Sequence, residues 1–325
     1  MSKEVHLAVL AYPGVMQSAL HGLTELFDVT NSLVTAHPDS DWPIFRCRIQ
    51  NVEPALSEVK SGQEKTIDQA SEEIAAYDVV ILPPRTTKTD WNPGDGNCRN
   101  WLQEQHGKGA ILASACAGAF LLADAGLLRG RRVTTHWGLA EEFRELYPEI
   151  NLCEQELLLD EGDIITAGGM MAWMDLALRL VERFASPFLS LELGKYFLVD
   201  TGQRDQRCYQ NFSPKFSHGD QEVLNLQRWL QANWNEGVDI GEMARIAQMG
   251  ERTLQRRFTK ATGLSPSIYV MELRLQKARE YLEVSRMTVD EIVWKVGYED
   301  QSSFRKLFKR ETGLTPSEYR KRFSR

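Results

Sequence analysis

A cysteine and a histidine follow two successive strand-like segments, and together they could do nucleophilic chemistry. Cys116 stands between an apolar run and a helical pattern, with small residues on both sides. Small neighbours suit a sharp strand-to-helix turn, and a helix N-terminus lowers a thiol's pKa and so favours the thiolate. His136 ends the next strand-like run. Taken alone, these residues favour a plainer interpretation: a buried cysteine and an ordinary polar histidine.

Two basic helix faces near the C-terminus predict a second kind of chemistry, the recognition of DNA. Arginine and glutamine can form paired hydrogen bonds with guanine and adenine, and lysine or arginine can neutralise phosphates. The predicted DNA-contacting residues are Arg252, Gln255, Arg256, Thr259 and Lys260 on the first face and Gln301, Ser302, Arg305, Lys306 and Lys309 on the second. The buried sides carry Leu254 and Phe258, then Phe304 and Phe308. One such helix would indicate only a solvated amphipathic face, but two in matched units favour DNA.

Both faces belong to a sequence pattern that occurs twice, about fifty positions apart. Gly263 and Pro266 of the first copy return as Gly313 and Pro316 of the second. Each copy predicts a short apolar helix, a tight turn, a second helix, and then glycine and proline as a stop. This is the outline of a helix-turn-helix, which places its second helix in the DNA major groove.

Residues 222–323 resemble the DNA-binding domain of AraC-type transcription regulators of bacteria. The resemblance rests on "RTLQRRFTKATGLSPSIYVMELRLQKAREYL" and "VGYEDQSSFRKLFKRETGLTPSEYRKRF". It implies two helix-turn-helix units, joined by a long helix, that read major-groove faces about 10 bp apart. The sequence departs from the usual family pattern at two places. Gly250-Glu251 stands where the family usually has serine followed by proline or a polar residue, and Val293 stands where the family usually has alanine.

The first 200 residues follow a different pattern, in which strand-like and helical segments alternate. The strand-like runs are 5–12, 45–50, 77–83, 109–115, 131–136 and 162–168, and the helical patterns include 17–34, 97–106, 138–147 and 170–185. Alternation with uninterrupted apolar strands predicts an α/β fold: a mostly parallel, flavodoxin-like sheet with helices on both faces. We expect this domain to span 1–200, a polar linker 201–219, and an all-α double helix-turn-helix domain 220–325.

The N-terminal part resembles the ThiJ/PfpI-like, glutamine-amidotransferase-related domain over roughly residues 5–185. The resemblance rests on "SACAGAFLLADAGLLRGRRVTTHW" and "DIITAGGMMAWMDLALRLVE". Enzymes of that superfamily carry a cysteine at the turn, a nearby histidine and an acid, and Cys116 and His136 match the first two positions. This domain ahead of an AraC-type domain resembles the GlxA-type branch of AraC-family regulators. There the first domain is taken to sense an effector, often an amino acid or a quaternary amine.

Two departures from the enzyme pattern predict a domain that binds a small molecule without turning it over. After the first strand-like run, Gln17 occupies the stretch where the enzymes commonly offer an acid. Pro83-Pro84-Arg85 replaces a Gly-Gly turn whose N–H can stabilise an oxyanion, and proline has no N–H to donate. Losing one such donor costs about 10²–10³ in rate. We expect no catalytic residue, with Cys116 and His136 as vestiges, and an effector site formed by Cys116, Ala117, His136, Gln17 and Arg85.

The favoured function is a sequence-specific DNA-binding transcription regulator, an activator, that answers to a small nitrogenous metabolite near Cys116. Two alternatives stay open at this point. One is a bifunctional regulator with Cys116-dependent hydrolase or hydratase activity, and the other is a redox sensor in which oxidation of Cys116 is the signal. The expected partners are double-stranded DNA, the effector, a second copy of the chain and, as a further candidate, RNA polymerase.

Charge and cysteine usage agree with this interpretation. Residues 220–325 hold 19 Lys/Arg against 15 Asp/Glu, whereas the preceding residues hold 19 against 30, so a mildly basic module follows an acidic one. Five scattered cysteines without a CxxC pair predict a reducing cytosol and no zinc site. The histidines show no metal-ligand spacing, so we expect no metal and no cofactor. With no signal segment and no convincing membrane span, the expected location is the cytoplasm.

Overall fold

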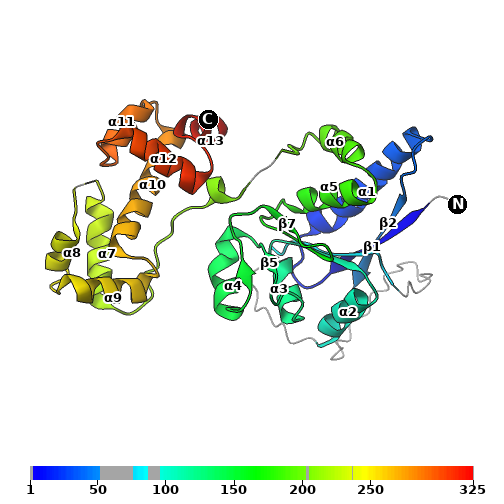
Figure 1. Ribbon diagram of the computed structural model, residues 1–325, viewed down its shortest axis with the longest axis horizontal. Helices are drawn as coiled ribbons and strands as arrows, with labels where there is room; N and C mark the ends of the chain where they lie inside the picture. The colour runs from blue at the N-terminus through cyan, green and yellow to red at the C-terminus, as the bar shows by residue number, and fades with distance from the viewer. Residues whose placement is uncertain (1–2, 52–75, 87–95, 203–204, 236, 325) are drawn as a thin grey trace, which may run out of the picture. The chain divides into compact units, whose positions relative to one another are not determined.

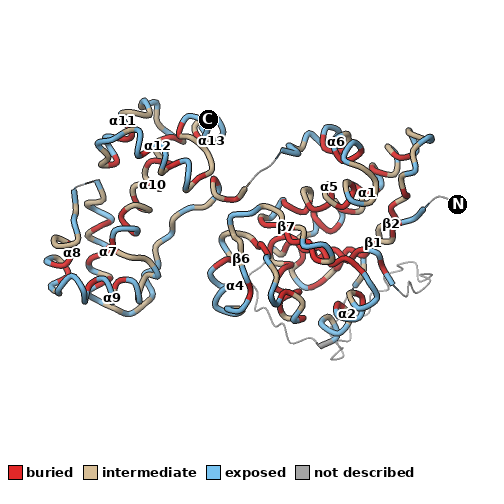
Figure 2. Tube along the Cα trace, in the orientation of Figure 1, coloured by how far each residue is buried: buried red, intermediate tan, exposed pale blue. Residues whose placement is uncertain are grey.

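The computed structural model describes residues 3–51, 76–86, 96–202, 205–235 and 237–324. The chain divides into two compact units, Met1–Gln206 and Arg207–Arg325 (Figure 1). Each unit buries its own apolar residues, which lie on the inner sides of its helices and strands (Figure 2). Within the described part of the chain, we find no helix with the length and apolar character needed to cross a membrane.

A six-stranded sheet forms the centre of the first unit, with the strand order β2-β1-β3-β4-β8-β7. The strands are β1 (Glu4–Ala11), β2 (Ile44–Asn51), β3 (Val79–Leu82), β4 (Ile111–Ala115), β7 (Leu158–Asp160) and β8 (Ile164–Ala167). Neighbouring strands are parallel from β2 to β8, and β7 pairs antiparallel with β8 at one edge. The inner strands β3, β4 and β8 are buried throughout, as uninterrupted apolar runs require. The predicted flavodoxin-like parallel sheet is therefore confirmed.

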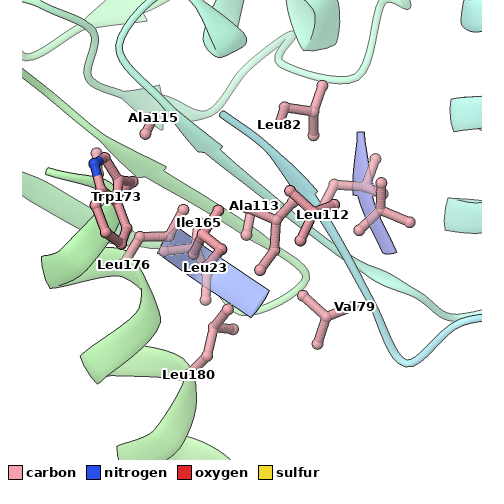
Figure 3. Close-up of a cluster of buried hydrophobic side chains, with 14 of the residues drawn as sticks. Leu23, Val79, Leu82, Leu112, Ala113, Ala115, Ile165, Trp173, Leu176 and Leu180 are labelled. Carbon is pink, nitrogen blue, oxygen red and sulfur yellow. The ribbon is translucent and has the colours of Figure 1, made fainter. Parts of the chain in front are cut away.

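Helices cover both faces of the sheet (Figure 1). On one side lie α1 (Gln17–Ala36) and α5 (Trp173–Phe184), with α6 (Pro187–Tyr196) packed on both; on the other lie α2 (Gly96–Gly107) and α3 (Gly118–Asp124). Leu23 of α1 and Leu176 of α5 lie beside Ile165 of β8 in the core between the sheet and the first layer (Figure 3). The two layers shield the central strands from water on both faces.

One predicted strand departs from expectation. Of the run 131–136, only β5 (Arg132–Val133) is a strand, and it pairs with β6 (Asn151–Leu152) in a separate two-stranded sheet. Side chains take up the neighbouring groups: Thr134 N donates to Thr166 Oγ1 at 2.9 Å, and Arg131 forms a two-pronged pair with Asp163. The run continues through the short helix η1 (Trp137–Leu139) into α4 (Ala140–Leu146).

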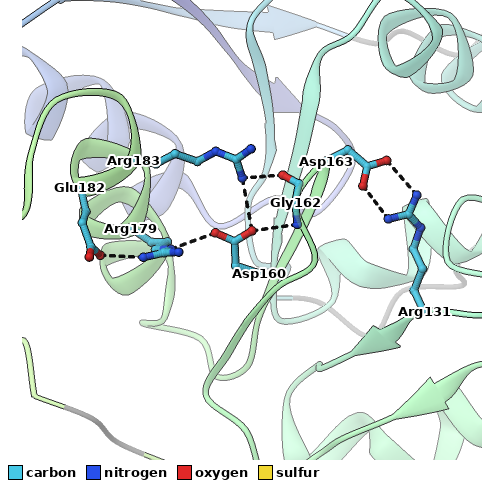
Figure 4. A network of polar contacts seen from close by, with 7 residues as sticks. All are labelled: Arg131, Asp160, Gly162, Asp163, Arg179, Glu182 and Arg183. Atoms are coloured by element: carbon cyan, nitrogen blue, oxygen red, sulfur yellow. Dashed lines mark hydrogen bonds and ion pairs between the residues drawn. The ribbon is translucent and has the colours of Figure 1, made fainter.

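Charged side chains fasten the β7–β8 hairpin to its surroundings (Figure 4). Asp160 accepts hydrogen bonds from Arg179 Nε at 2.9 Å and from Arg183 Nη1 at 3.2 Å, both on α5. Beside it, the hydrogen bond from Arg131 holds the pKa of the Asp163 carboxyl well below its usual range. The hairpin is thus held from α5 on one side and from the segment before β5 on the other.

The second unit is all-helical. A short helix η2 (Arg207–Tyr209) precedes α7 (Gln221–Asn233), α8 (Ile240–Ile246), α9 (Glu251–Thr262), α10 (Pro266–Val284), α11 (Val289–Lys295), α12 (Gln301–Thr312) and α13 (Pro316–Phe323). These helices enclose two cores, and α10 contributes to both, with Tyr269 and Leu273 in the first and Leu275 and Leu282 in the second. The predicted double helix-turn-helix with a long connecting helix is confirmed.

The segment expected to be a linker, 201–219, is packed at several points. Gln206 is buried in the first unit, and Cys208 is buried in the second core of the second unit. Phe212 packs edge-on against Tyr269 with ring centroids 5.2 Å apart. Positions 203–204 lie outside the described residues. Isolated buried side chains leave no periodic pattern, so a polar, turn-rich composition conceals them.

Candidate functional site

The first predicted set of DNA-contacting residues lies on one exposed face of α9. Leu254 and Phe258 are buried beneath it, as the spacing predicts. The exposed residues line an open groove of about 900 Å³ formed by Arg252, Thr253, Gln255, Arg256, Thr259 and Lys260. Thr253 is an addition, because sequence reasoning left it out. A groove with three cationic side chains suits a phosphate backbone and adjacent base edges.

The second predicted set lies on α12 in the same arrangement. Ser302, Arg305, Lys306 and Lys309 are exposed and Gln301 is half-buried, over the buried Phe304 and Phe308. All five line an open groove of about 640 Å³, together with Glu299, Asp300 and Thr315. Asp300 caps the helix as predicted, accepting from Ser302 N at 2.9 Å and Ser303 N at 3.2 Å.

A common framework holds the two helices. Gly263 and Gly313 end α9 and α12 in the left-handed conformation, with φ of 78° and 76°, which glycine adopts without strain. Beneath them Tyr269 packs edge-on against Phe258 at 5.2 Å, and Tyr319 against Phe308 at 5.4 Å. The sequence repeat is therefore also a structural repeat, in which α9 and α12 present corresponding faces.

The two faces differ in their acidic neighbours. Arg305 Nη2 lies 2.6 Å from Asp290 Oδ1 of α11, and Glu299 and Asp300 line the α12 groove. The residues that line the α9 groove include no carboxylate. Each groove has three cationic side chains, and the acids nearest the α9 face, Asp220 and Glu222, line a separate hollow beside Arg256 and Lys260, where they pair with Arg257.

Arg257 has a different role from Arg256, because it forms ion pairs within the fold. Its Nη2 lies 2.7 Å from Asp220 Oδ1 and 2.6 Å from Glu222 Oε2. The hydrogen bond from Arg257 lowers the pKa of the Asp220 carboxyl, and Asp220 also caps α7. Arg257 thus fastens α9 to the start of α7.

The elbow after β4 forms the core of the candidate effector site. Cys116 has a φ of 53° and is 3% exposed, and its N–H donates to Ala167 O at 2.8 Å. Positive φ is uncommon for a non-glycine residue. Two residues on, a Cβ at Gly118 would lie 2.4 Å from the backbone oxygen of Leu82. The small residues around Cys116 therefore allow α3 to start directly against β3.

The Cys116 thiol is not activated in the way its position suggested. Burial raises its pKa to about 11, and the opposing hydrogen bond at the Ala117 backbone is the smaller effect. Helix α3 has seven residues, so its dipole offers little against the desolvation of the charged form. Burial therefore outweighs the helix N-terminus at this thiol, and a protonated thiol also argues against a redox sensor.

Two loops close around this elbow at the carboxyl ends of β1 and β3. Met16 N donates to Pro84 O at 2.8 Å, and Val15 and Arg85 form an isolated antiparallel bridge. Gln17 then begins α1 with an exposed side chain whose Nε2 donates to Val15 O at 3.4 Å. The structure therefore brings Gln17 and Arg85 to the sheet edge that holds Cys116, the edge where ligands gather in such folds.

Tyr12 is a member of this cluster that sequence reasoning missed. Its hydroxyl donates to Pro83 O, and burial is the main cause of its raised pKa. Cys116 raises that pKa further and Arg85 lowers it, so the hydroxyl lies within electrostatic range of both. Tyr12 is the last residue of the strand-like run 5–12, so the sequence pattern does not distinguish it from an ordinary strand residue.

His136 is near the elbow without serving it as a base. Gly138 N donates to His136 Nδ1 at 2.9 Å, which assigns the proton of the neutral ring to Nε2, and burial lowers the pKa of the imidazole. The adjacent Thr135 donates from Oγ1 to Cys116 O at 2.7 Å. In the described structure no hydrogen bond joins the side chains of His136 and Cys116. A nucleophile–base pair is therefore not formed here.

Comparisons with known proteins match each of the two units to a known domain family. A DJ-1/PfpI family model matches residues 45–183, and a helix-turn-helix domain model matches residues 243–322. The chain is a DJ-1/PfpI domain joined to an AraC-type helix-turn-helix domain. Similar proteins include the HTH-type transcriptional regulator GbdR of Pseudomonas aeruginosa, 29% identical over 225 residues, which are 68% of this chain and 60% of the relative. The regulator GlxA of Rhizobium meliloti is 28% identical over 235 residues, 72% of each chain.

Both of these relatives are named as HTH-type transcriptional regulators. The chain spans about 60% of the length of the first of these relatives. A crystal structure of an AraC family transcriptional regulator from Pseudomonas putida covers 60% of the chain and 99% of that structure, with 18% identity and a TM-score of 0.45. The curated relatives are named as regulators and not as enzymes, which supports the prediction of a non-enzymatic protein.

Among the residues that the structure describes, no three His, Cys, Asp or Glu side chains come together as a set that could hold a metal ion. The five cysteines all lie among the described residues, and none of them forms a disulfide.

Proposed function

We propose that this protein binds duplex DNA sequence-specifically through α9 and α12 and thereby regulates transcription in the cytoplasm. One observation carries the proposal: two helices held by the same framework each present an exposed basic face with arginine and glutamine at its centre or its start. Those side chains are the ones that recognise guanine and adenine in the major groove. Two such helices in one unit could enter two successive major-groove segments of the same duplex.

Within this interface we assign base recognition mainly to Gln255 and Arg256 of α9. Both are exposed and line the groove that has no acidic residue. Lys260 and Lys309, near the ends of α9 and α12, are suited to phosphates because an ammonium is a compact charge without a fixed fork.

Selection from random DNA tests the proposal. The full chain would be used to enrich duplexes from a random pool, and its affinity for an enriched and a scrambled duplex would be compared at physiological salt. Preference for the enriched duplex by about 10³-fold or more is expected of a specific regulator. Equal affinity for the two duplexes would contradict sequence-specific binding.

We also propose that the elbow binds a small nitrogenous effector, through Cys116, Ala117, His136, Gln17 and Arg85, with Tyr12 as an added member. The convergence of loops after β1, β3 and β4 supports this, since ligands of such folds bind beyond the carboxyl ends of strands. A protonated Cys116 and a His136 engaged with Gly138 suit binding better than turnover.

A thermal-shift screen of the full chain against choline, glycine and arginine tests the effector site, with product analysis of every hit. A compound that stabilises the first unit and is recovered unchanged, and whose effect Cys116→Trp abolishes by filling the site, is the expected result. Consumption of the compound in a Cys116-dependent way would contradict a binding role. Stabilisation that survives Cys116→Trp would place the site elsewhere.

We propose further that the DNA-bound form is a homodimer that activates transcription through RNA polymerase. One similarity supports activation over repression: the RhaS proteins of Yersinia, named as transcriptional activators, are 38% identical over 103 residues, which are 31% of this chain and 38% of the relative. In vitro transcription from a template that carries the enriched duplex upstream of a promoter tests the direction. A fall in transcript on addition of the protein would contradict activation, and light scattering would give the assembly size.

A further inference from the structure

Gln206, the last residue of the first unit, is buried among more hydrogen-bond acceptors than it can satisfy. It is 2% exposed. Its Nε2 lies within 3.2 Å of four acceptors: Thr134 Oγ1, Thr135 O, Glu154 O and Glu156 O. A side-chain amide has two hydrogens to donate. The amide can therefore bond only two of the four at any moment, and it can exchange partners without leaving its pocket; Glu156 O also accepts from Thr134 Oγ1 at 2.8 Å.

The pocket around this amide is shaped for it. Gln206 Oε1 accepts from Trp137 N at 3.2 Å, and the backbone N–H of Gln206 donates to Gln155 O at 2.8 Å. A Cβ at Gly168 would lie 1.9 Å from Gln206 Nε2. Gly168, directly after β8, leaves room for the Gln206 side chain because it has no Cβ. Gln206 therefore packs as part of the first unit.

Thr135 connects this amide to the effector elbow. Its Oγ1 donates to Cys116 O at 2.7 Å, and its own carbonyl accepts from Gln206 Nε2 at 2.9 Å. Thr135 is fully buried, so both bonds are made away from water. A shift of the backbone at Cys116 must therefore change the position of Thr135 or break one of its two bonds.

The two residues that follow Gln206 are anchored in the second helix-turn-helix. Arg207 Nη1 donates to Arg310 O, in the last turn of α12, at 2.9 Å. Cys208 is 4% exposed and packs in the core that contains Phe304 and Phe308 of the same helix. Each of these contacts lies within one unit, and the peptide bond between Gln206 and Arg207 joins the two sets.

We propose that Thr135 and Gln206 form a relay that transmits the state of the Cys116 elbow to α12. The proposal rests on the proposed function, because it takes the elbow as the effector site and α12 as a DNA-binding helix. An effector that favours one arrangement of the elbow selects one set of Gln206 acceptors, and with it one position of the chain that enters the core beneath α12. An effector that bound both arrangements equally would transmit nothing.

Thermodynamic linkage allows a test that needs no identified effector. If the elbow influences DNA binding, DNA binding must influence the elbow by the same factor. The probe is the alkylation rate of Cys116 by N-ethylmaleimide in the full chain, in which the thiolate adds to the maleimide double bond. Mass spectrometry of the Cys116 peptide separates this cysteine from the other four. We expect an enriched duplex to change the rate about fivefold or more in the wild-type chain, the lower end of common coupling factors.

Variants then locate the route. Gln206→Met keeps the length of the side chain and removes its hydrogen bonds, and Thr135→Val removes only the bond to Cys116. Either should abolish the DNA-dependent change in rate while DNA binding persists. The matched control is Gln105→Met: Gln105 is also buried in the first unit, at 3% exposed, and accepts from Tyr77 N at 3.1 Å outside the relay. This control should keep the full change.

Each outcome separates the two proposals. A wild-type chain that binds the duplex with no change at Cys116 would overturn the relay alone. The same change in rate in the wild type, Gln206→Met and Thr135→Val would overturn the route while leaving the coupling in place. A chain that shows no preference for any enriched duplex would overturn the proposed function itself.

Discussion

Arg256 and Arg257 are neighbours in the sequence, yet the fold gives them separate tasks. Arg256 lines the α9 groove, while Arg257 is held by Asp220 and Glu222. Helical spacing predicts that both lie near one face. The acids that distinguish them come from the start of α7, more than thirty positions earlier, and no local pattern reveals such a partner.

Alanine substitutions should separate these two arginines. We expect Arg256→Ala to cost about 1–3 kcal/mol on the enriched duplex and to relax preference at one base position, with thermal stability unchanged. Arg257→Ala should lower the melting temperature of the second unit and leave base preference intact. Fluorescence anisotropy and thermal denaturation measure the two effects, with Arg129→Ala in the first unit as a charge-matched control. Equal losses on enriched and scrambled DNA for Arg256→Ala would rule out its base contact.

Lysine substitutions should act on all DNA alike. Lys260→Ala and Lys309→Ala should each weaken binding to enriched and scrambled duplexes by the same factor. Each should also reduce the slope of log affinity against log salt by about one unit, because one fewer phosphate is neutralised. A salt titration of the wild type and both variants checks this. A loss confined to the enriched duplex would show base contact instead.

The elements show how far local pattern determines the fold. The spacing 17–34 predicted α1, which runs from Gln17 to Ala36, and the repeat predicted both helix-turn-helix units. The run 131–136 was wrong as a strand of the main sheet, because its groups bond to Thr166 and Asp163, which follow about thirty residues later. Amphipathic spacing and glycine stops are local signals, whereas side-chain partners from distant elements are not.

The close approach of α3 and β3 makes a prediction about Gly118. Adding a methyl group at Gly118→Ala places a carbon against a backbone oxygen that cannot move away, so we expect a cost of about 1–3 kcal/mol, as for other overpacked sites. Chemical denaturation of the first unit measures it. Gly107→Ala is the matched control, since nothing lies within 4 Å of a Cβ there. A Gly118→Ala chain as stable as this control would contradict the tight elbow.

The β7–β8 hairpin should depend on pH through Asp163. Its pKa is lowered in the folded protein by the hydrogen bond from Arg131. The unfolded pKa is about 3.9, so the stabilisation is fully present above that pH and is lost as the pH falls towards the lower folded pKa. Thermal denaturation should show Asp163→Asn less stable than the wild type at pH 6, with the gap narrowing at pH 3. If the difference in stability between Asp163→Asn and the wild type did not change with pH, the charge of the Asp163 carboxylate would not be its cause.

The whole molecule combines an acidic unit that suits a small ligand with a mildly basic unit that suits DNA. Sequence resemblance identified both domains, and the comparisons agree. The packing of the polar segment 201–219 could not be predicted from the sequence. Gln206 and Cys208, on either side of the boundary between the units, are both buried. Their partners are distant backbone groups, which composition does not show.

The proposed function requires that α9 and α12 of one chain each enter a DNA major groove. Hydroxyl-radical and dimethyl-sulfate footprinting of the full chain on an enriched duplex tests it most directly. We expect each bound chain to protect two major-groove segments about 10 bp apart, with Arg256→Ala relieving protection of guanines in only one of them. A single protected segment for each bound chain, or protection that moves freely along scrambled DNA, would contradict the account.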